Sequence, residues 1–244
     1  MTAIKTEGLR KEYKDVVAVE GLDLEVGEGE LFSLLGVNGA GKTTTVKMLS
    51  GLTIPTSGDA EICGFSVVKE PDRVKESIDV SMQETAIARK LTVEENIAFY
   101  AAMRGHVKER IEQDKEYVYS VFGLDSVAKR YAGKLSGGWQ RKLSVALALI
   151  SRPKVLFLDE PTLGLDVIAR RELWSTIREL KGKMTVILTT HYMEEAEALS
   201  DRIGVMKDGR LLFVGTQEEM YASTGKGNVE DAFIEIVTGG ERNA

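Results

Sequence analysis

A glycine-rich stretch at residues 36–44, which we call the phosphate loop, reads GVNGAGKTT. Its spacing of glycine, four residues, glycine, lysine and a hydroxyl residue lets several backbone N–H groups turn inward on one polyphosphate, aided by the positive end of the following helix. Lys42 would reach the β and γ phosphates, and the Thr43 hydroxyl would hold magnesium. A glycine-rich turn that binds nothing is the alternative. The candidate nucleotide-binding residues of this loop are Gly36, Val37, Asn38, Gly39, Ala40, Gly41, Lys42, Thr43 and Thr44.

Two adjacent carboxylates, Asp159 and Glu160, follow the apolar residues 155–158. In an open α/β sheet, the carboxyl ends of the strands face the ligand crevice. Asp159 would hold the hydration shell of the magnesium ion, whereas Glu160, pointing the other way, could polarise the attacking water. Alone, the pair could be two solvated acids at a strand end. Together with the phosphate loop, it indicates a nucleotide-hydrolysing site.

The sequence Leu-Ser-Gly-Gly at residues 135–138, which we call the serine-glycine segment, is a third candidate. Ser136 can cap a helix, and the free N–H groups of Gly137 and Gly138 favour a phosphate oxygen. The alternative is a simple helix cap after a loop. Its position shortly before the two carboxylates favours the anion site.

These residues need a scaffold, and the hydrophobic pattern predicts alternating strands and helices. Alternating apolar residues predict an antiparallel sheet at the start of the chain, at 4–9, 16–19 and 22–26. Nearly continuous apolar runs predict strands buried in a parallel sheet, at 31–35, 155–158 and 185–189, with a further strand at 78–82. Helical patterns at 44–49 and 169–180 belong to a β, α, β alternation.

A helical subdomain is expected between residues 91 and 150, where the strand signals vanish. Thr92 and Glu95 form a capping box for a helix that runs to about Arg104. Further helices are expected over residues 107–122 and from Ser136 to before Pro153.

The tail from residue 202 predicts a hairpin with Asp208 and Gly209 at the turn, followed by a short helix around residues 231–236. No stretch resembles an interdomain linker. The sequence therefore predicts one domain over residues 1–240 with the helical subdomain inserted in its core, and the hairpin and short helix at about residues 202–240.

Composition excludes several classes of protein. The 244 residues are 43% hydrophobic and 29% charged, an ordinary globular balance, and the net charge of −6 argues against a general nucleic-acid binder. The single cysteine, Cys63, cannot form an internal disulfide, which suggests a reducing compartment. No apolar stretch approaches the ~20 residues that cross a bilayer. We therefore expect a soluble, cytoplasmic chain that a separate subunit would tether to a membrane.

The chain resembles the ATP-binding subunit of an ABC transporter over essentially its whole length. The resemblance depends on the Walker A residues 36–43, the serine-glycine segment, the Walker B residues 155–160 and His191 after Thr189 and Thr190. It implies an α/β P-loop NTPase with a mixed, mostly parallel sheet, an N-terminal antiparallel β subdomain and a helical subdomain that carries the serine-glycine segment. It also implies ATP and Mg²⁺ as ligands.

The resemblance implies further site residues. Gln83 is similar to a glutamine that senses magnesium and the γ phosphate and contacts the membrane subunit, and His191 is similar to a switch histidine at the γ phosphate. Tyr13 lies where the family places a ring on the adenine, or packs on the core as a strand-edge tyrosine. Asp166, in a loop that crosses the dimer interface, could also merely cap the helix at 169–180. The catalytic set implied is Glu160, His191, Lys42 and Gln83.

Two residues depart from the family pattern. Trp139 stands where glutamine is common, and Leu163 stands where serine is common. Neither change removes a phosphate-binding group, so we expect altered dimer packing and intact catalysis. Trp139 could instead pack against the neighbouring helical layer.

The resemblance implies a head-to-tail dimer, either homodimer or heterodimer, that sandwiches two ATP molecules. Each ATP would contact Lys42, Thr43, Asp159 and Gln83 of one subunit, and Ser136 and Gly138 of the other. The partner would be an integral-membrane permease on a separate chain, with this chain peripheral on the inner face of the membrane. Residues 159–166 and 228–239 are similar to drug-efflux exporter subunits, which favours export.

Two other functions stay open at this stage. A soluble ABC-type ATPase could act as an assembly or regulatory factor and transport nothing. A nucleotide-binding scaffold without turnover is a third hypothesis, which Glu160 and His191 disfavour.

Overall fold

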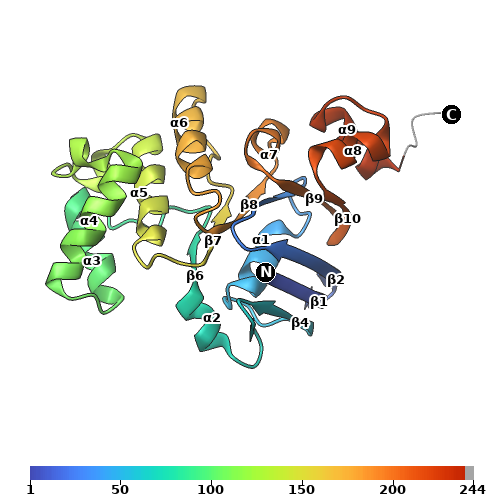
Figure 1. The fold of residues 1–244 in the computed structure, drawn as a ribbon, viewed down its shortest axis with the longest axis horizontal. Helices are drawn as coiled ribbons and strands as arrows, with labels where there is room; N and C mark the ends of the chain where they lie inside the picture. Colours follow the sequence, from blue (N-terminus) through green and yellow to red (C-terminus); the bar gives the residue numbers. More distant parts are fainter. Residues whose placement is uncertain (240–244) are drawn as a thin grey trace.

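The central sheet of the protein holds six strands. A computed structural model describes residues 1–239, and the sheet runs in the order β10-β9-β3-β8-β7-β6 (Figure 1). Its strands are β3 (Leu31–Leu35), β6 (Ile78–Ser81), β7 (Val155–Asp159), β8 (Thr185–Thr190), β9 (Arg202–Lys207) and β10 (Arg210–Gly215). All neighbours pair in parallel except β9 and β10. Every residue of β3, β7 and β8 is buried, which confirms the parallel strands predicted from the apolar runs.

A second, antiparallel sheet is formed mainly by the start of the chain. It contains β1 (Thr2–Tyr13), β2 (Val16–Gly27), β4 (Ser57–Ile62) and β5 (Phe65–Ser66), in the order β2-β1-β4-β5. The predicted sheet is confirmed, but the break at Gly21 is wrong, because β2 is one continuous strand that absorbs the irregularity as register shifts against β1. Helix α1 (Lys42–Leu49) packs between the two sheets.

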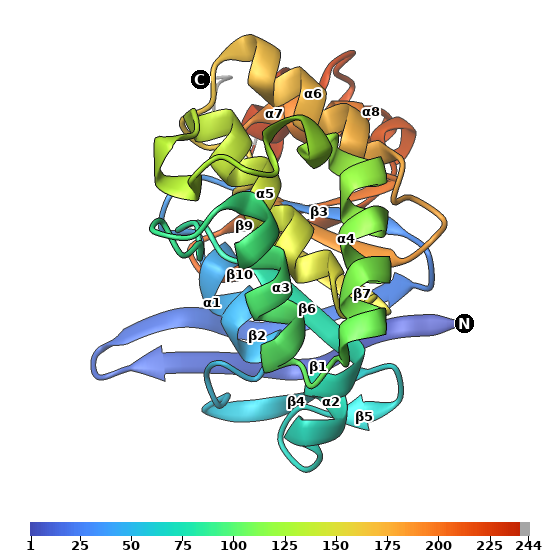
Figure 2. The ribbon, with the colours of Figure 1, turned by 90° about the vertical axis from the view of Figure 1, so that its left-hand side faces the viewer.

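The predicted helical region is confirmed. It contains α3 (Val93–Met103), α4 (Lys108–Phe122), two 3₁₀ turns (Leu124–Val127 and Ala132–Lys134) and α5 (Gly137–Leu149). The Thr92 hydroxyl accepts from the Glu95 N–H, and the Glu95 carboxylate accepts from the Thr92 N–H, which confirms the predicted capping box of α3. Figure 1 shows these helices on one side of the molecule, with α5 closer to the central sheet than α3, and Figure 2 views the molecule from that side.

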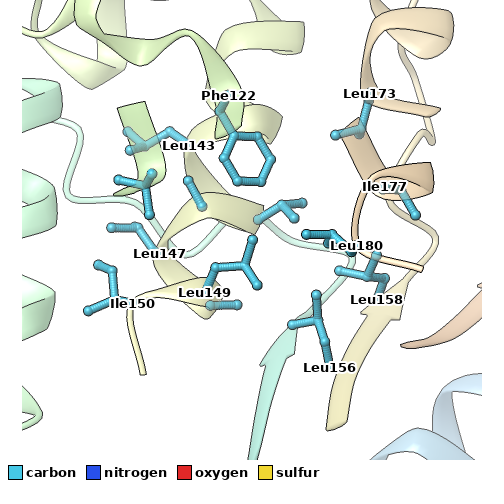
Figure 3. Close-up of a cluster of buried hydrophobic side chains, with 14 of the residues drawn as sticks. Phe122, Leu143, Leu147, Leu149, Ile150, Leu156, Leu158, Leu173, Ile177 and Leu180 are labelled. Atoms are coloured by element: carbon cyan, nitrogen blue, oxygen red, sulfur yellow. The ribbon is translucent and has the colours of Figure 1, made fainter. Parts of the chain in front are cut away.

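The helical region shares its hydrophobic core with the central sheet. Leu143, Leu147 and Leu149 of α5 meet Leu156 and Leu158 of β7 in one buried cluster (Figure 3). The same cluster includes the predicted stripe of α6 (Val167–Arg178), formed by Leu173 and Ile177 and continued by Leu180. One continuous core therefore fixes the orientation of α5 and α6 relative to the strand that carries the two carboxylates.

The C-terminal region follows the predicted hairpin with additions. The β9–β10 turn lies at Asp208 and Gly209, and α9 (Val229–Thr238) covers the expected short helix. However, β9 also pairs with β3 and belongs to the central sheet. Three helices were not predicted: α2 (Pro71–Ser77), α7 (Met193–Leu199) and α8 (Gln217–Thr224).

The mixed, mostly parallel sheet with an antiparallel sheet and a helical region confirms the predicted α/β fold class. Residue 240, where the predicted domain ends, lies outside the described residues. Among residues 1–239, every helix is too short or too polar to cross a bilayer.

Candidate functional site

The phosphate loop connects β3 to α1, and two of its glycines are required by close neighbours. A Cβ on Gly36 would lie 2.4 Å from the Met206 carbonyl oxygen, and a Cβ on Gly41 would lie 2.4 Å from the Ala18 carbonyl oxygen. Gly41 also has a φ of +104°, a conformation that glycine adopts at little cost. The loop is therefore shaped by the strands around it, at the carboxyl edge of the central sheet.

Lys42 folds back over the phosphate loop. Its Nζ donates to the carbonyl oxygens of Gly36 at 2.7 Å and Val37 at 3.1 Å, and lies 3.5 Å from Glu160 Oε1. Burial lowers the pKa of the Lys42 ammonium, and the nearby Glu160 carboxylate opposes that shift. The loop thus holds a buried cation against its own carbonyl oxygens, and a positive charge is what a polyphosphate requires.

Thr43 and Asp159 meet across the two elements that carry them. The Thr43 hydroxyl lies 3.0 Å from both Oδ1 and Oδ2 of Asp159, and the Thr189 hydroxyl donates to Asp159 Oδ1 at 2.6 Å. A hydroxyl and a carboxylate are hard oxygen donors of the kind that Mg²⁺ prefers. The donor set at this position therefore fits a magnesium ion.

Glu160 faces away from Asp159, toward Lys42 and His191. Its Oε1 lies 3.3 Å from His191 Nδ1, and its side chain is nearly buried. The backbone of Glu160 has a φ of +46°, in the left-handed region, and its N–H donates to both the carbonyl and the hydroxyl of Thr189. The two carboxylates thus contact different partners, and the left-handed turn at Glu160, just after the end of β7, sets the direction of the second one.

Lys42, Thr43, Glu160 and His191 line one cleft of about 630 Å³, whereas Asp159 is fully buried behind Thr43. Val16, Val17 and Ala18 of β2 form one wall, and Leu163 also contributes. The predicted site residues that line the cleft are Asn38, Gly39, Ala40, Gly41, Lys42, Thr43, Thr44, Gln83, Glu160 and His191. Gln83 is exposed and is one of these lining residues.

Tyr13 does not line this cleft. Its side chain is 44% exposed at the end of β1, and Lys11 Nζ lies 5.0 Å from the centre of its ring. The alternative that Tyr13 packs on the core is therefore wrong. The ring is solvent-facing near the β1–β2 turn, whereas Val16 and its neighbours reach the cleft.

The serine-glycine segment lies in a different hollow of about 270 Å³, lined by Ser136, Gly138, Trp139 and residues of α6. Ser136 occupies the position before α5, but within residues 1–239 its side chain makes no capping bond. The predicted side-chain cap is therefore wrong, since the hydroxyl stays exposed and free. Within one chain, the structure does not bring this segment to the phosphate loop.

Asp166 and Trp139 border the same hollow. Asp166 Oδ1 accepts from the N–H groups of Ile168 at 3.0 Å and Ala169 at 2.9 Å, which confirms the helix-capping role considered for it. The Trp139 ring packs against the core cluster, and Lys142 Nζ lies 4.8 Å from its centre. The tryptophan therefore contacts the neighbouring helical layer.

Two buried charged residues near the cleft were not predicted. Arg141 of α5 is 4% exposed and bonds to four backbone carbonyls. Glu195 of α7 is fully buried and accepts from the Thr162 hydroxyl and from Trp174 Nε1, both at 2.8 Å. A sequence signal for Arg141 existed, because Ser144, Val145 and Ala148, which share its helix face, are small or apolar. A basic residue on such a face implies a partnered cation.

Comparison with known proteins agrees with this geometry. The family model described as "ABC transporter" matches residues 19–163. The daunorubicin/doxorubicin resistance ATP-binding protein DrrA of Streptomyces peucetius is 40% identical over 224 residues, covering 91% of this chain and 68% of that protein. ABC transporter A family member 7 of Dictyostelium discoideum is 41% identical over 229 residues, covering 93% of this chain and 27% of that protein.

Solved structures agree as well. A structure described as the ATP binding subunit of an ABC transporter superposes with a TM-score of 0.85 at 26% identity, covering 97% of this chain and 100% of that one. The chain spans about a quarter of the length of the A family relatives that it matches. The chain belongs to the ABC transporter family.

Proposed function

We propose that residues 1–240 act as one ATPase unit that binds ATP with Mg²⁺ in the cleft and powers an exporter, with the helical subdomain at 91–150 as its inserted part. The observation that carries this proposal is the convergence of Lys42, Thr43, Asp159 and Glu160 at the carboxyl edge of the sheet. Phosphate-binding and water-activating groups line one cleft there, and the buried Asp159 carboxylate lies 3.0 Å from the Thr43 hydroxyl at its edge.

Each residue has a distinct role in this proposal. Lys42 and the loop N–H groups of residues 36–44 hold the β and γ phosphates, and Thr43, Asp159 and Gln83 hold the magnesium ion with its water ligands. When bound, the ion neutralises charge on the phosphate oxygens.

Glu160 and His191 act at the γ phosphate and the attacking water. The Glu160 carboxylate orients the water and accepts its proton. His191, whose Nδ1 lies 3.3 Å from Glu160 Oε1, contacts the γ phosphate. Because the Glu160 side chain is nearly buried, few other waters compete for it.

A dimer explains why the serine-glycine segment lies outside this cleft. Among the described residues the Ser136 hydroxyl makes no capping bond, and Gly137 and Gly138 begin α5, so N–H groups at the start of this helix are open to an anion. We infer that the γ phosphate bound by one subunit meets this helix end of a second subunit, in a homodimer or a heterodimer. Tyr13, which is exposed and pairs with Val16 of the cleft wall, is then available to the adenine.

Export through a separate permease is supported by the relatives whose printed names refer to drug resistance. We infer that an integral-membrane subunit docks near Gln83 and holds this chain on the inner face of the membrane. Co-purification tests this part: a hydrophobic, multi-span protein is expected, and a soluble partner in its place would indicate an assembly factor.

The Glu160→Gln variant tests the ATPase site and the dimer together. Gln keeps the shape of the side chain and loses the proton acceptor, so turnover should fall by roughly 10²–10⁴-fold while ATP stays bound. Size-exclusion chromatography with light scattering should then detect an ATP-dependent dimer. Near-normal phosphate release would reject Glu160 as the base, and a variant that stays monomeric at saturating ATP would reject the dimer.

A further inference from the structure

Arg141 of α5 connects two segments beside the catalytic cleft, residues 82–83 after β6 and residues 159–161 at the end of β7. Its Nε donates to Pro161 O at 2.7 Å, and its Nη2 donates to Asp159 O at 2.9 Å. Its Nη1 donates to Met82 O at 2.7 Å and to Gln83 O at 3.0 Å. One guanidinium therefore fixes the ends of β6 and β7 and the loop after Glu160 relative to one another.

The chemistry of this contact favours arginine. A planar guanidinium presents its N–H groups as a rigid fork, which can reach carbonyls on two sides at once. Burial lowers the pKa of Arg141 to about 10, so the group keeps its charge at neutral pH. Its hydrogen bonds go to carbonyl oxygens, whose positions follow the backbone, and so the contact responds to any movement of those loops.

The same helix carries the serine-glycine segment at its start. Ser136 precedes α5 and Arg141 lies on its second turn, so a short rigid element joins them. The apolar side of α5 is packed through Leu143 and Leu147 against the shared core (Figure 3). Gly138 also lies close to α6, where an added Cβ would be 2.8 Å from the Cβ of Ala169. The start of α5 therefore cannot be displaced independently of Arg141.

We propose that Arg141 is a positioning residue that couples the catalytic loops of its own subunit to the placement of its serine-glycine segment, which completes the ATP site of the partner subunit. This inference rests on the dimer proposed above. Arg141 itself touches neither ATP nor the reacting water. When ATP binding moves the backbone at Gln83 or Asp159, the guanidinium of Arg141 moves with it and shifts α5. The serine-glycine segment at the start of α5 then shifts relative to the ATP bound by the partner subunit.

The test uses Arg141→Met and Arg141→Lys, each alone and combined with Glu160→Gln. ATP affinity of the single subunit should change by less than about threefold, because Arg141 makes no contact with the phosphate loop. ATP-driven dimerisation in the Glu160→Gln background should weaken by about tenfold or more, and the Hill coefficient of hydrolysis in the otherwise unchanged protein should fall toward unity. Arg141→Lys keeps the charge without the fork and should give a partial defect.

Arg178→Met is the matched control. Arg178 is an exposed arginine of α6 with one bond to a backbone carbonyl, that of Ala198, at 3.0 Å. Its loss removes a guanidinium without touching the catalytic loops, so dimerisation and the Hill coefficient should match those of the parent protein.

The outcomes separate this inference from the proposed function. A Glu160→Gln parent that does not dimerise would refute the proposed dimer itself. If the Glu160→Gln parent dimerises, and Arg141→Met has the same ATP dependence of dimerisation and the same Hill coefficient as its parents, the coupling is refuted. If Arg141→Met lowers ATP affinity and dimerisation equally, Arg141 has only a structural role, and the inference is overturned. If Arg141→Met does not fold, Arg141→Lys decides by the same two measurements.

Discussion

Replacing Gly137 or Gly138 by alanine separates folding of the subunit from assembly of the ATP site. A Cβ on Gly138 would lie 2.8 Å from the Cβ of Ala169, which is roughly 0.7 Å inside an optimal carbon–carbon contact. Ala169 has no flexible side chain that could retreat, so α5 must shift against α6. A Cβ on Gly137 meets nothing within 4 Å.

The stability change follows from this difference. Overpacking of this kind costs about 1–3 kcal/mol, and for a chain of this size each kcal/mol lowers Tm by roughly 2–4 °C. Gly138→Ala should therefore lower Tm by roughly 2–12 °C. Gly137→Ala should leave Tm unchanged or raise it slightly, because alanine restricts the unfolded chain more than glycine does.

Assembly should respond differently. If Gly137 faces the phosphate bound by the partner subunit, the added methyl group fills the space that the phosphate needs. In the Glu160→Gln background, Gly137→Ala should then lose ATP-driven dimerisation at normal Tm and normal single-subunit ATP affinity. Differential scanning fluorimetry, light scattering and equilibrium nucleotide binding measure the three quantities. A Gly137→Ala protein that dimerises normally would refute the reasoning, as would a Gly138→Ala protein with an unchanged Tm.

Two other changes test single contacts. Lys42→Ala removes the cation at the phosphate loop and should weaken ATP binding by at least about tenfold in equilibrium titration; unchanged affinity would contradict the assignment. Burial raises the pKa of the Glu195 carboxyl above its ordinary 4.5, so the folded protein binds that proton more tightly than the unfolded chain does. The contribution of Glu195 to the free energy of unfolding should therefore decrease as the pH rises above 4.5. Glu195→Gln should remove this pH dependence. Chemical denaturation at several pH values measures the free energy of unfolding of both proteins. If the parent protein and Glu195→Gln show the same pH dependence, the prediction is wrong.

The elements that the sequence predicted are those whose signal is local. Continuous apolar runs identify β3, β7 and β8 because both faces of these strands are buried. In contrast, β4 reads SGDAEI, and Ala60 and Ile62 are its two buried residues. Its register is set by pairing with β1, far away along the chain. Such a strand cannot be recognised from a short window.

The same division applies to the site. The phosphate loop and the two carboxylates were found because each motif is contiguous in the sequence. Arg141 was missed because its four partners come from two segments far from it along the chain. The Ser136 cap was wrong for a different reason, since a residue type suited to capping can occupy the N-cap position without making the side-chain bond.

The strained backbone at Glu160 lowers the stability of the fold, while its side chain is the one proposed to activate water. A residue with a Cβ at a φ of +46° carries strain of about 1–2 kcal/mol, which glycine would relieve. Glu160→Gly would therefore relax the turn after β7 and also remove the carboxylate between Lys42 and His191. Laboratory evolution that selects for heat tolerance alone should therefore favour Glu160→Gly, which lacks the catalytic carboxylate. A screen for ATP turnover should retain the glutamate despite its strain.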